Sequence, residues 1–166
     1  VEKNTKDTHS TAVFLKQYAK EQGIACAIKE ERLKKLKGKR WRFTIGTETP
    51  QECILARGDT AQSDKLIAGF KKTHLIVGDL PYGVQHKGKL RELLSEALPV
   101  WTSLLHPGGA MALAWESTRF PRTDMIALIE SESPLRVLNR PPYDMLTHQV
   151  DRVIKKRDVI VAVRSS

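Results

Sequence analysis

The stretch that decides the fold is His74-Leu75-Ile76-Val77-Gly78-Asp79-Leu80-Pro81-Tyr82-Gly83. Its apolar part ends in an acid followed by a Pro-Tyr-Gly turn, and this pattern predicts a buried strand of an α/β sheet. Sheets of this class bind their ligands just beyond the carboxyl ends of the strands. We therefore expect Asp79 and Tyr82 to lie at the active edge of the sheet.

The segment from Asp79 to Gly83 resembles motif IV of those class I methyltransferases that use S-adenosyl-L-methionine to methylate exocyclic amines of nucleobases. In the form Asp79-Leu80-Pro81-Tyr82 it is most similar to the tRNA guanine-N2 methyltransferases that usually carry a THUMP domain. An exocyclic amine is a poor nucleophile, because its lone pair is delocalised into the ring. Acceptors that hold its hydrogens also stabilise the developing positive charge. The resemblance implies that the Asp79 carboxylate and the Leu80 carbonyl are these acceptors.

The other two residues of the motif have expected roles of their own. Pro81 stiffens the turn, and Tyr82 stacks on a base taken out of its helix. The alternative is an ordinary strand-to-loop turn, where Asp, Pro and Gly are common. A competing motif, Asn139-Arg140-Pro141-Pro142-Tyr143, resembles an Asn-Pro-Pro-Tyr site, but Arg140 separates its Asn from the prolines. It also follows a different strand, so we favour the segment at Asp79.

The order of the other predicted elements agrees with the resemblance. Helices are expected at 8–22, 64–70, 89–105 and 123–132, and strands at 52–59, 74–79, 110–115, 135–138 and 158–163. The resemblance implies a Rossmann-like class I methyltransferase fold, α/β in class, with a mostly parallel sheet, helices on both faces and an antiparallel last strand. Residues 1–166 are interpreted as a partial methyltransferase domain, strands two to seven, with a basic insertion at 25–52. The first strand and its glycine-rich loop are expected to be absent from this chain.

Two local patterns carry further expectations about the fold. The helix at 8–22 has an apolar stripe that should cover the sheet, formed by Ala12, Val13, Phe14 and Tyr18. The segment Leu105-His106-Pro107-Gly108-Gly109 predicts a tight turn between a helix and the following strand. In the family that the chain resembles, this turn is a marker of the fold and has no chemistry.

The resemblance also implies a site for S-adenosyl-L-methionine. Glu2 matches the acid at the end of the second strand, which binds the ribose hydroxyls of the cofactor. Asp59, with Thr60 beside it, matches the acid after the third strand that binds the adenine amine. Asp79 borders the same site. For Glu2 the alternative is a solvated side chain, and Gly-Asp at Asp59 is a weak motif when taken alone.

The charge of the chain favours a polyanionic partner. There are 28 Lys and Arg against 19 Asp and Glu, which gives a formal net charge of +9. The segment 25–52 mixes basic and aromatic residues, a composition that suits phosphate contact and base stacking. The residues expected to bind nucleic acid are Lys35, Lys37, Lys39, Arg40 and Trp41. The alternative is a solvated helix and hairpin with Trp41 packed inward. A second basic patch is expected at Arg152, Lys155, Lys156 and Arg157.

Composition excludes several other classes. No apolar run is long enough to cross a membrane. Two cysteines are too few for a disulfide framework or a zinc site, so we expect no metal and a reducing, cytoplasmic location. The expected function is methyl transfer to an exocyclic amine in RNA, with tRNA as the substrate. The alternatives are a DNA adenine or cytosine amino-methyltransferase, whose motif more often has a doubled proline, and a non-catalytic RNA-binding module.

Overall fold

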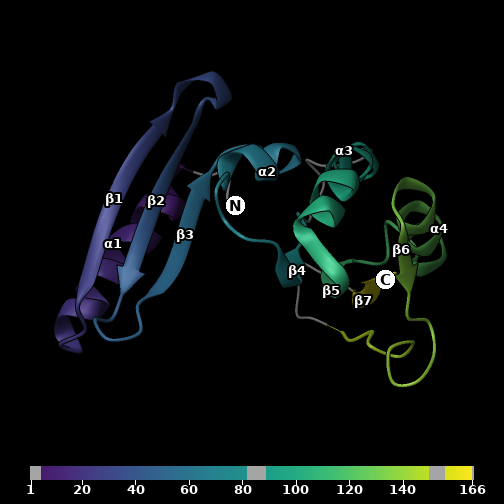
Figure 1. The fold of residues 1–166 in the computed structure, drawn as a ribbon. Coiled ribbons are helices and arrows are strands. Elements are labelled where there is room, and N and C mark those ends of the chain that lie inside the picture. Colours follow the sequence, from purple (N-terminus) through teal and green to yellow (C-terminus); the bar gives the residue numbers. More distant parts are fainter. Residues whose placement is uncertain (1–4, 82–88, 150–155, 166) are drawn as a thin grey trace. The chain divides into compact units, whose positions relative to one another are not determined.

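The computed structural model describes residues 5–81, 89–149 and 156–165 (Figure 1). The chain forms two compact units, unit 1 (Val1–Phe70) and unit 2 (Lys71–Ser166). Unit 1 has a three-stranded sheet in the order β1-β2-β3, and unit 2 has a four-stranded sheet in the order β4-β5-β7-β6. The predicted α/β class is confirmed. That the two units form one partial methyltransferase domain stays a prediction.

Unit 1 is an antiparallel sheet with one long helix. Its elements are α1 (Thr5–Glu21), β1 (Cys26–Leu33), the 3₁₀ turn η1 (Lys34–Leu36), β2 (Gly38–Ile45), β3 (Gln51–Arg57), η2 (Thr60–Gln62) and α2 (Ser63–Leu66). The basic segment 25–52 is therefore mainly the hairpin of β1 and β2. A small core of Ala12, Trp41 and Phe43 joins α1 to the sheet.

The strand predicted at 52–59 is present as β3, but its predicted place in the sheet is wrong. β3 pairs antiparallel with β2, from Ile45–Gln51 to Lys39–Arg57, and does not join the sheet of unit 2. The reason is local, because a short connection lets consecutive strands pair antiparallel, whereas parallel neighbours need a long crossover.

The predicted covering stripe of α1 is confirmed at Ala12 and wrong at Val13, Phe14 and Tyr18. Val13, Phe14 and Tyr18 are at least half exposed, and the rings of Phe14 and Tyr18 stack on each other with centroids 6.0 Å apart. The helix buries a row of small residues on one side, Thr8, Ala12 and Ala19. Small side chains let the helix backbone approach the sheet closely, so the larger residues remain on the outer side.

Unit 2 contains the predicted antiparallel last strand. Its elements are β4 (Thr73–Asp79), α3 (Lys89–Leu104), β5 (Leu105–Glu116), α4 (Arg122–Glu132), β6 (Leu135–Val137) and β7 (Arg157–Arg164). β4 and β5 are parallel, and β7 is antiparallel to both β5 and β6. The last strand thus lies between β5 and β6, and in unit 2 the expected mostly parallel sheet with an antiparallel last strand is confirmed.

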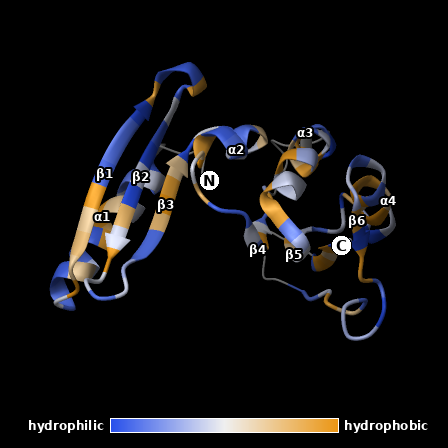
Figure 2. Ribbon diagram, in the orientation of Figure 1, coloured by the Kyte–Doolittle hydropathy of each residue, from blue (hydrophilic) through white to orange (hydrophobic). Residues whose placement is uncertain are grey.

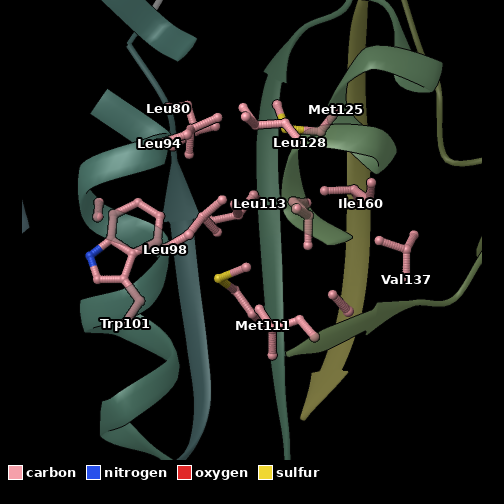
Figure 3. Close-up of a cluster of buried hydrophobic side chains, with 14 of the residues drawn as sticks. Leu80, Leu94, Leu98, Trp101, Met111, Leu113, Met125, Leu128, Val137 and Ile160 are labelled. Carbon is pink, nitrogen blue, oxygen red and sulfur yellow. The ribbon is translucent and has the colours of Figure 1, made fainter. Parts of the chain in front are cut away.

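The core of unit 2 lies between its helices and one face of the sheet. Figure 3 shows Leu98 of α3 and Met125 of α4 directed at Met111 and Leu113 of β5. Within the described part of unit 2, both helices therefore cover the same face, in contrast to the prediction of helices on both faces.

The opposite face of the unit 2 sheet carries Leu75 and Val77, which are 55% and 73% exposed. β4 is also the edge strand of this sheet. The strand predicted to be buried is thus buried on one face only, where Ile76 packs against the core. Its period-2 alternation decides which residues meet α3.

The predicted turn at residues 105–109 is an irregularity inside β5. The register with β4 shifts between the pairs Thr73–Leu105 and Leu75–Ala110. Gly108 has φ +75°, a conformation that residues with a Cβ rarely adopt, and it permits this shift. The Pro-Gly-Gly sequence therefore interrupts the pairing within a strand instead of ending a helix.

Each unit has its own core, so a core mutation should act within one unit. Phe43→Ala is expected to lower the free energy of unfolding of unit 1 by about 3–5 kcal/mol, because Phe43 is fully buried. Native-state hydrogen exchange should show lost protection in β1–β3 and unchanged protection in β5 and β7. Leu98→Ala in α3 is the matched control and should give the reverse pattern. An equal loss in both units for both variants would contradict the division into two units.

Candidate active site

The candidate site lies at the edge of the unit 2 sheet where β4 and β5 end. The two strands are parallel, so their last residues, Asp79 and Glu116, lie at the same edge. β7 runs the other way, so its first residue, Arg157, lies there too and is paired in register with Glu116. The direction of three strands therefore gathers three charged side chains at one edge.

Asp79 is held by an ion pair with Arg157. The Nη2 atom of Arg157 donates to Oδ1 of Asp79 at 2.6 Å. On the intervening strand the residue opposite Asp79 is Ala114, and its methyl group leaves room for the arginine to cross. The Asp79 side chain is still 55% exposed. Because an ionised carboxylate has about four acceptor sites, Asp79 retains the capacity to accept further hydrogen bonds.

Leu80, directly after Asp79, packs into the core and fixes the position of the chain at this edge of the sheet. The Leu80 side chain is buried in the cluster of unit 2, and its N–H donates to the carbonyl of Ala114 at 2.9 Å. Pro81 follows and is exposed. The chain is thus fixed in position directly beside the carboxylate. Tyr82, the fourth residue of the predicted motif, lies outside the described residues.

At the end of β5, the polar groups of Glu116 and Trp115 make contacts with residues close in sequence. Glu116 pairs with Arg119 at 3.4 Å and accepts the hydroxyl hydrogen of Thr118 at 2.9 Å. Trp115 is fully buried, and its indole N–H donates to the carbonyl of Phe120 at 2.7 Å. The exposed acceptor of the sheet edge is therefore Asp79, while Trp115 belongs to the core.

The competing motif at 139–143 has a structural role. Arg122 donates from Nε to the amide oxygen of Asn139 at 3.1 Å and from Nη2 to the carbonyl of Tyr143 at 2.7 Å. Its Nη1 meets both oxygens of Asp158 at 3.2 Å, and Asp158 is almost fully buried. This arginine fastens the loop to α4 and β7, in agreement with the interpretation of a rigid loop.

The predicted cofactor residues that the structure describes belong to different units. Asp59 caps η2, where its Oδ1 accepts the N–H of Ala61 at 3.0 Å. The Thr60 hydroxyl lies 3.4 Å from that of Ser63. Both residues belong to unit 1, whereas Asp79 belongs to unit 2. Glu2 lies outside the described residues.

Among the predicted nucleic-acid residues, Lys37, Lys39 and Trp41 line a pocket of about 440 Å³ in unit 1. Lys35 is exposed and does not line it. Arg40 lies on the opposite face of the sheet, where it pairs with Glu31 and donates to the carbonyl of Ala68 at 2.9 Å. Arg40 therefore stabilises unit 1 internally.

Trp41 packs inward, as the alternative interpretation of this segment had it. It is 6% exposed, and its indole N–H donates to Glu30 at 2.9 Å. Lys39 Nζ lies over the indole ring, 4.7 Å from its centroid. Both contacts hold the ring in place, so Trp41 does not offer a face on which a base could stack.

Residues that were not predicted from the sequence contribute to the sheet edge at Asp79 and to the pocket of unit 1. Arg157 was assigned to a basic patch and is instead the partner of Asp79. The pocket of unit 1 also contains Arg32, Lys34, Arg57 and His9. Residues two apart in a strand share a face. Arg32 follows Glu30 by two residues, and Arg57 follows Leu55 by two. This even spacing is the sequence signal that could have identified both arginines.

Other features of the described residues bear on the site. No group of three His, Cys, Asp or Glu among them is arranged to hold a metal ion. Both cysteines, Cys26 and Cys53, are free thiols. No helix in the described ranges is long and apolar enough to cross a membrane.

Comparisons with known proteins give only distant structural neighbours. No protein-family model matches the chain, and a search of curated proteins gives no match. Among solved structures, TrmN from Thermus thermophilus has 19% identity and a TM-score of 0.43, covering 65% of this chain and 27% of that protein. A second protein of Thermus thermophilus, assigned as a DNA modification methylase, has 18% identity and a TM-score of 0.43, covering 66% and 51%.

A further structure of the second protein is complexed with S-adenosyl-L-methionine, at 17% identity and a TM-score of 0.42. This chain thus spans about a quarter to a half of the length of these neighbours. Values this low establish no shared activity. What these proteins bind or modify is a property of those proteins.

The ion pairs Arg122–Asp158 and Arg157–Asp79 of unit 2 should differ strongly in their effect on stability. Asp158→Ala is expected to lower the free energy of unfolding by about 3–5 kcal/mol, because it leaves the charge of Arg122 without its buried partner. Asp79→Ala removes an exposed pair and should cost less than about 1 kcal/mol. Urea denaturation of both variants, followed by circular dichroism, measures the difference. Equal effects would contradict the assigned burial of Asp158.

Proposed function

We propose that this protein transfers a methyl group from S-adenosyl-L-methionine to the exocyclic amine of a base in RNA, with guanine N2 of tRNA as the target. The observation that carries the proposal is Asp79, an exposed carboxylate at the edge where β4 and β5 end. The sequence Leu80-Pro81-Tyr82 follows it directly. Edges of this kind are where α/β sheets bind ligands.

In this proposal the chain supplies acceptors and position, and S-adenosyl-L-methionine supplies the methyl group. Asp79 accepts a hydrogen bond from the amine and stabilises the positive charge that develops on its nitrogen. The Leu80 carbonyl is the proposed second acceptor. Its position is supported by the buried Leu80 side chain and by the bond from its N–H to Ala114. A preorganised acceptor of this kind favours the transition state over the ground state.

Arg157 is the proposed positioning residue for Asp79. Its guanidinium binds one carboxylate oxygen, Oδ1, at 2.6 Å. This bond limits rotation of the carboxylate and leaves the other oxygen for the amine. Pro81 is proposed to stiffen the turn, and Tyr82 to stack on the flipped base.

The proposed cofactor contacts and the proposed substrate are inferred from the sequence. Glu2, Asp59 and Thr60 are the proposed contacts to S-adenosyl-L-methionine, as the resemblance implies. The choice of RNA over DNA rests on Leu80 and Gly83, since DNA enzymes more often have a doubled proline in this motif. A non-catalytic nucleic-acid-binding module is the second candidate, and the basic pocket of unit 1 favours it.

Asp79→Ala in the full natural protein is expected to lower methyl transfer about a hundredfold or more, because one preorganised electrostatic contact is lost. Affinity for S-adenosyl-L-methionine should remain nearly unchanged, since the contact acts mainly on the reacting amine. The measurements are transfer of labelled methyl to a tRNA pool, identification of the modified nucleoside, and calorimetric titration of the cofactor. Tyr82→Ala should weaken productive base binding by about 1–3 kcal/mol, whereas Tyr82→Phe keeps the ring and should be tolerated.

The outcomes separate the candidate functions. Full activity of Asp79→Ala would show that the motif is only a turn. A methyl group found on a carbon or on a ribose oxygen would exclude the amine mechanism even in an active enzyme. Absence of both cofactor binding and transfer in the unmodified protein would favour the non-catalytic module.

A further inference from the structure

We propose that the pocket of unit 1 binds consecutive backbone phosphates of a polynucleotide and recognises them without stacking on bases. The pocket has a volume of about 440 Å³. Its basic lining residues are His9, Arg32, Lys34, Lys37, Lys39 and Arg57. This inference deepens the proposed function, on which it rests only for the choice of a nucleic acid as the polyanion.

A row of three like charges crosses the sheet at the pocket. Arg32 of β1 is paired in register with Lys39 of β2, and Lys39 is paired with Arg57 of β3. Residues directly opposite each other on antiparallel strands share a face, and like charges in such positions repel. A local arrangement that opposes stability is expected where it serves a function. A bound anion would relieve this repulsion.

The turn between β1 and β2 adds two further cations to the same pocket. Lys34 begins the 3₁₀ turn η1, and Lys37 follows it in a left-handed conformation with φ 48°. The N–H of Lys37 donates to the carbonyl of Lys34 at 3.2 Å. Lys34 and Lys37 line the pocket, whereas Lys35 does not.

Positive charge predominates in the pocket. Among the described residues that line it there is no Asp or Glu. Glu30 pairs with Lys39 at 2.6 Å, and this hydrogen bond from Lys39 holds the pKa of the Glu30 carboxyl below its ordinary value. Glu30 thus stays ionised at neutral pH and offsets part of the positive charge of Lys39 and Arg32. The two ends of β1 and β2 that meet at η1 are mostly hydrophilic (Figure 2).

The chemistry of the pocket favours a phosphate backbone over bases. Arginine and lysine are the side chains that contact nucleic-acid phosphates. The aromatic residue of the pocket, Trp41, is buried and held by Glu30 and Lys39. Without an accessible ring, the pocket offers charge and no stacking surface. RNA and DNA strands of equal length should therefore bind it with similar affinity.

The test compares two variants of equal charge in the full chain. The pocket variant is Arg32→Gln, Lys34→Gln, Lys37→Gln. The control variant is Lys16→Gln, Lys20→Gln, Lys65→Gln, whose three residues are exposed and do not line the pocket. Fluorescence anisotropy would measure binding of an oligo-U RNA and an oligo-T DNA of equal length over a range of salt concentrations, without S-adenosyl-L-methionine. Inorganic triphosphate serves as the competing small anion.

Each phosphate contact on a single strand contributes about 0.7 to the slope of log affinity against log salt, so the loss of three cations should lower the slope of the pocket variant by about 2. We therefore expect this variant to bind about 100-fold more weakly than the unmodified chain near physiological salt. The control variant should keep the slope and most of the affinity. Arg32→Gln alone should leave the melting temperature at low salt unchanged or higher, since it shortens the row of like charges. If Arg32 had a purely structural role, its substitution would lower the melting temperature.

Three outcomes would overturn the inference. One is equal weakening in the pocket and control variants, which would mean that only net charge matters. Another is a marked preference for one base sequence that the pocket variant loses, which would indicate base recognition. The third is displacement of the oligonucleotide by equimolar inorganic triphosphate, which would assign the pocket to a small polyphosphate ligand. All three concern binding alone, so they are independent of methyl transfer and of Asp79.

Discussion

The sheet of unit 2 and the charged residues at its edge depend on the direction in which β7 runs. This strand pairs with β5 from Ala110–Val163 to Glu116–Arg157, and on its other side with β6. In the described sheet it is the strand that joins β6 to β4 and β5. Because β7 is antiparallel, its first residue and not its last lies where β4 and β5 end. The direction of one strand therefore brings the cation at position 157 to the carboxylate at position 79.

The same edge is sensitive to register. Asp79 and Leu80 are consecutive, and they point to opposite sides, one exposed and one buried. A slip of one residue in β4 would expose Leu80 and bury the charge of Asp79 against α3, at a high cost in free energy. The apolar side chain thus fixes the orientation of its polar neighbour. This coupling explains how a short exposed segment can hold a carboxylate in a defined place.

The elements could be predicted from the sequence more fully than their pairing. Long periodic segments such as α3 and β7 lie close to where their apolar patterns indicated. The contact of Asp79 with Arg157 joins residues 78 positions apart, and no local pattern carries that information. The exposed stripe of α1 fails for a related reason. Periodicity shows that a helix has an apolar side, but the residues it meets decide which side is buried.

The charges of unit 1 show how the placement of a residue can matter more than its type. Basic and aromatic residues alternate in β2, which is typical of nucleic-acid surfaces, but in a strand this alternation separates them onto opposite faces. Trp41 and Phe43 enter the core, while Arg40 and Arg42 pair with glutamates on the other face. At the hairpin end, the register instead aligns Arg32, Lys39 and Arg57 side by side. Composition predicts that a polyanion is attracted, and the register decides where it can be held.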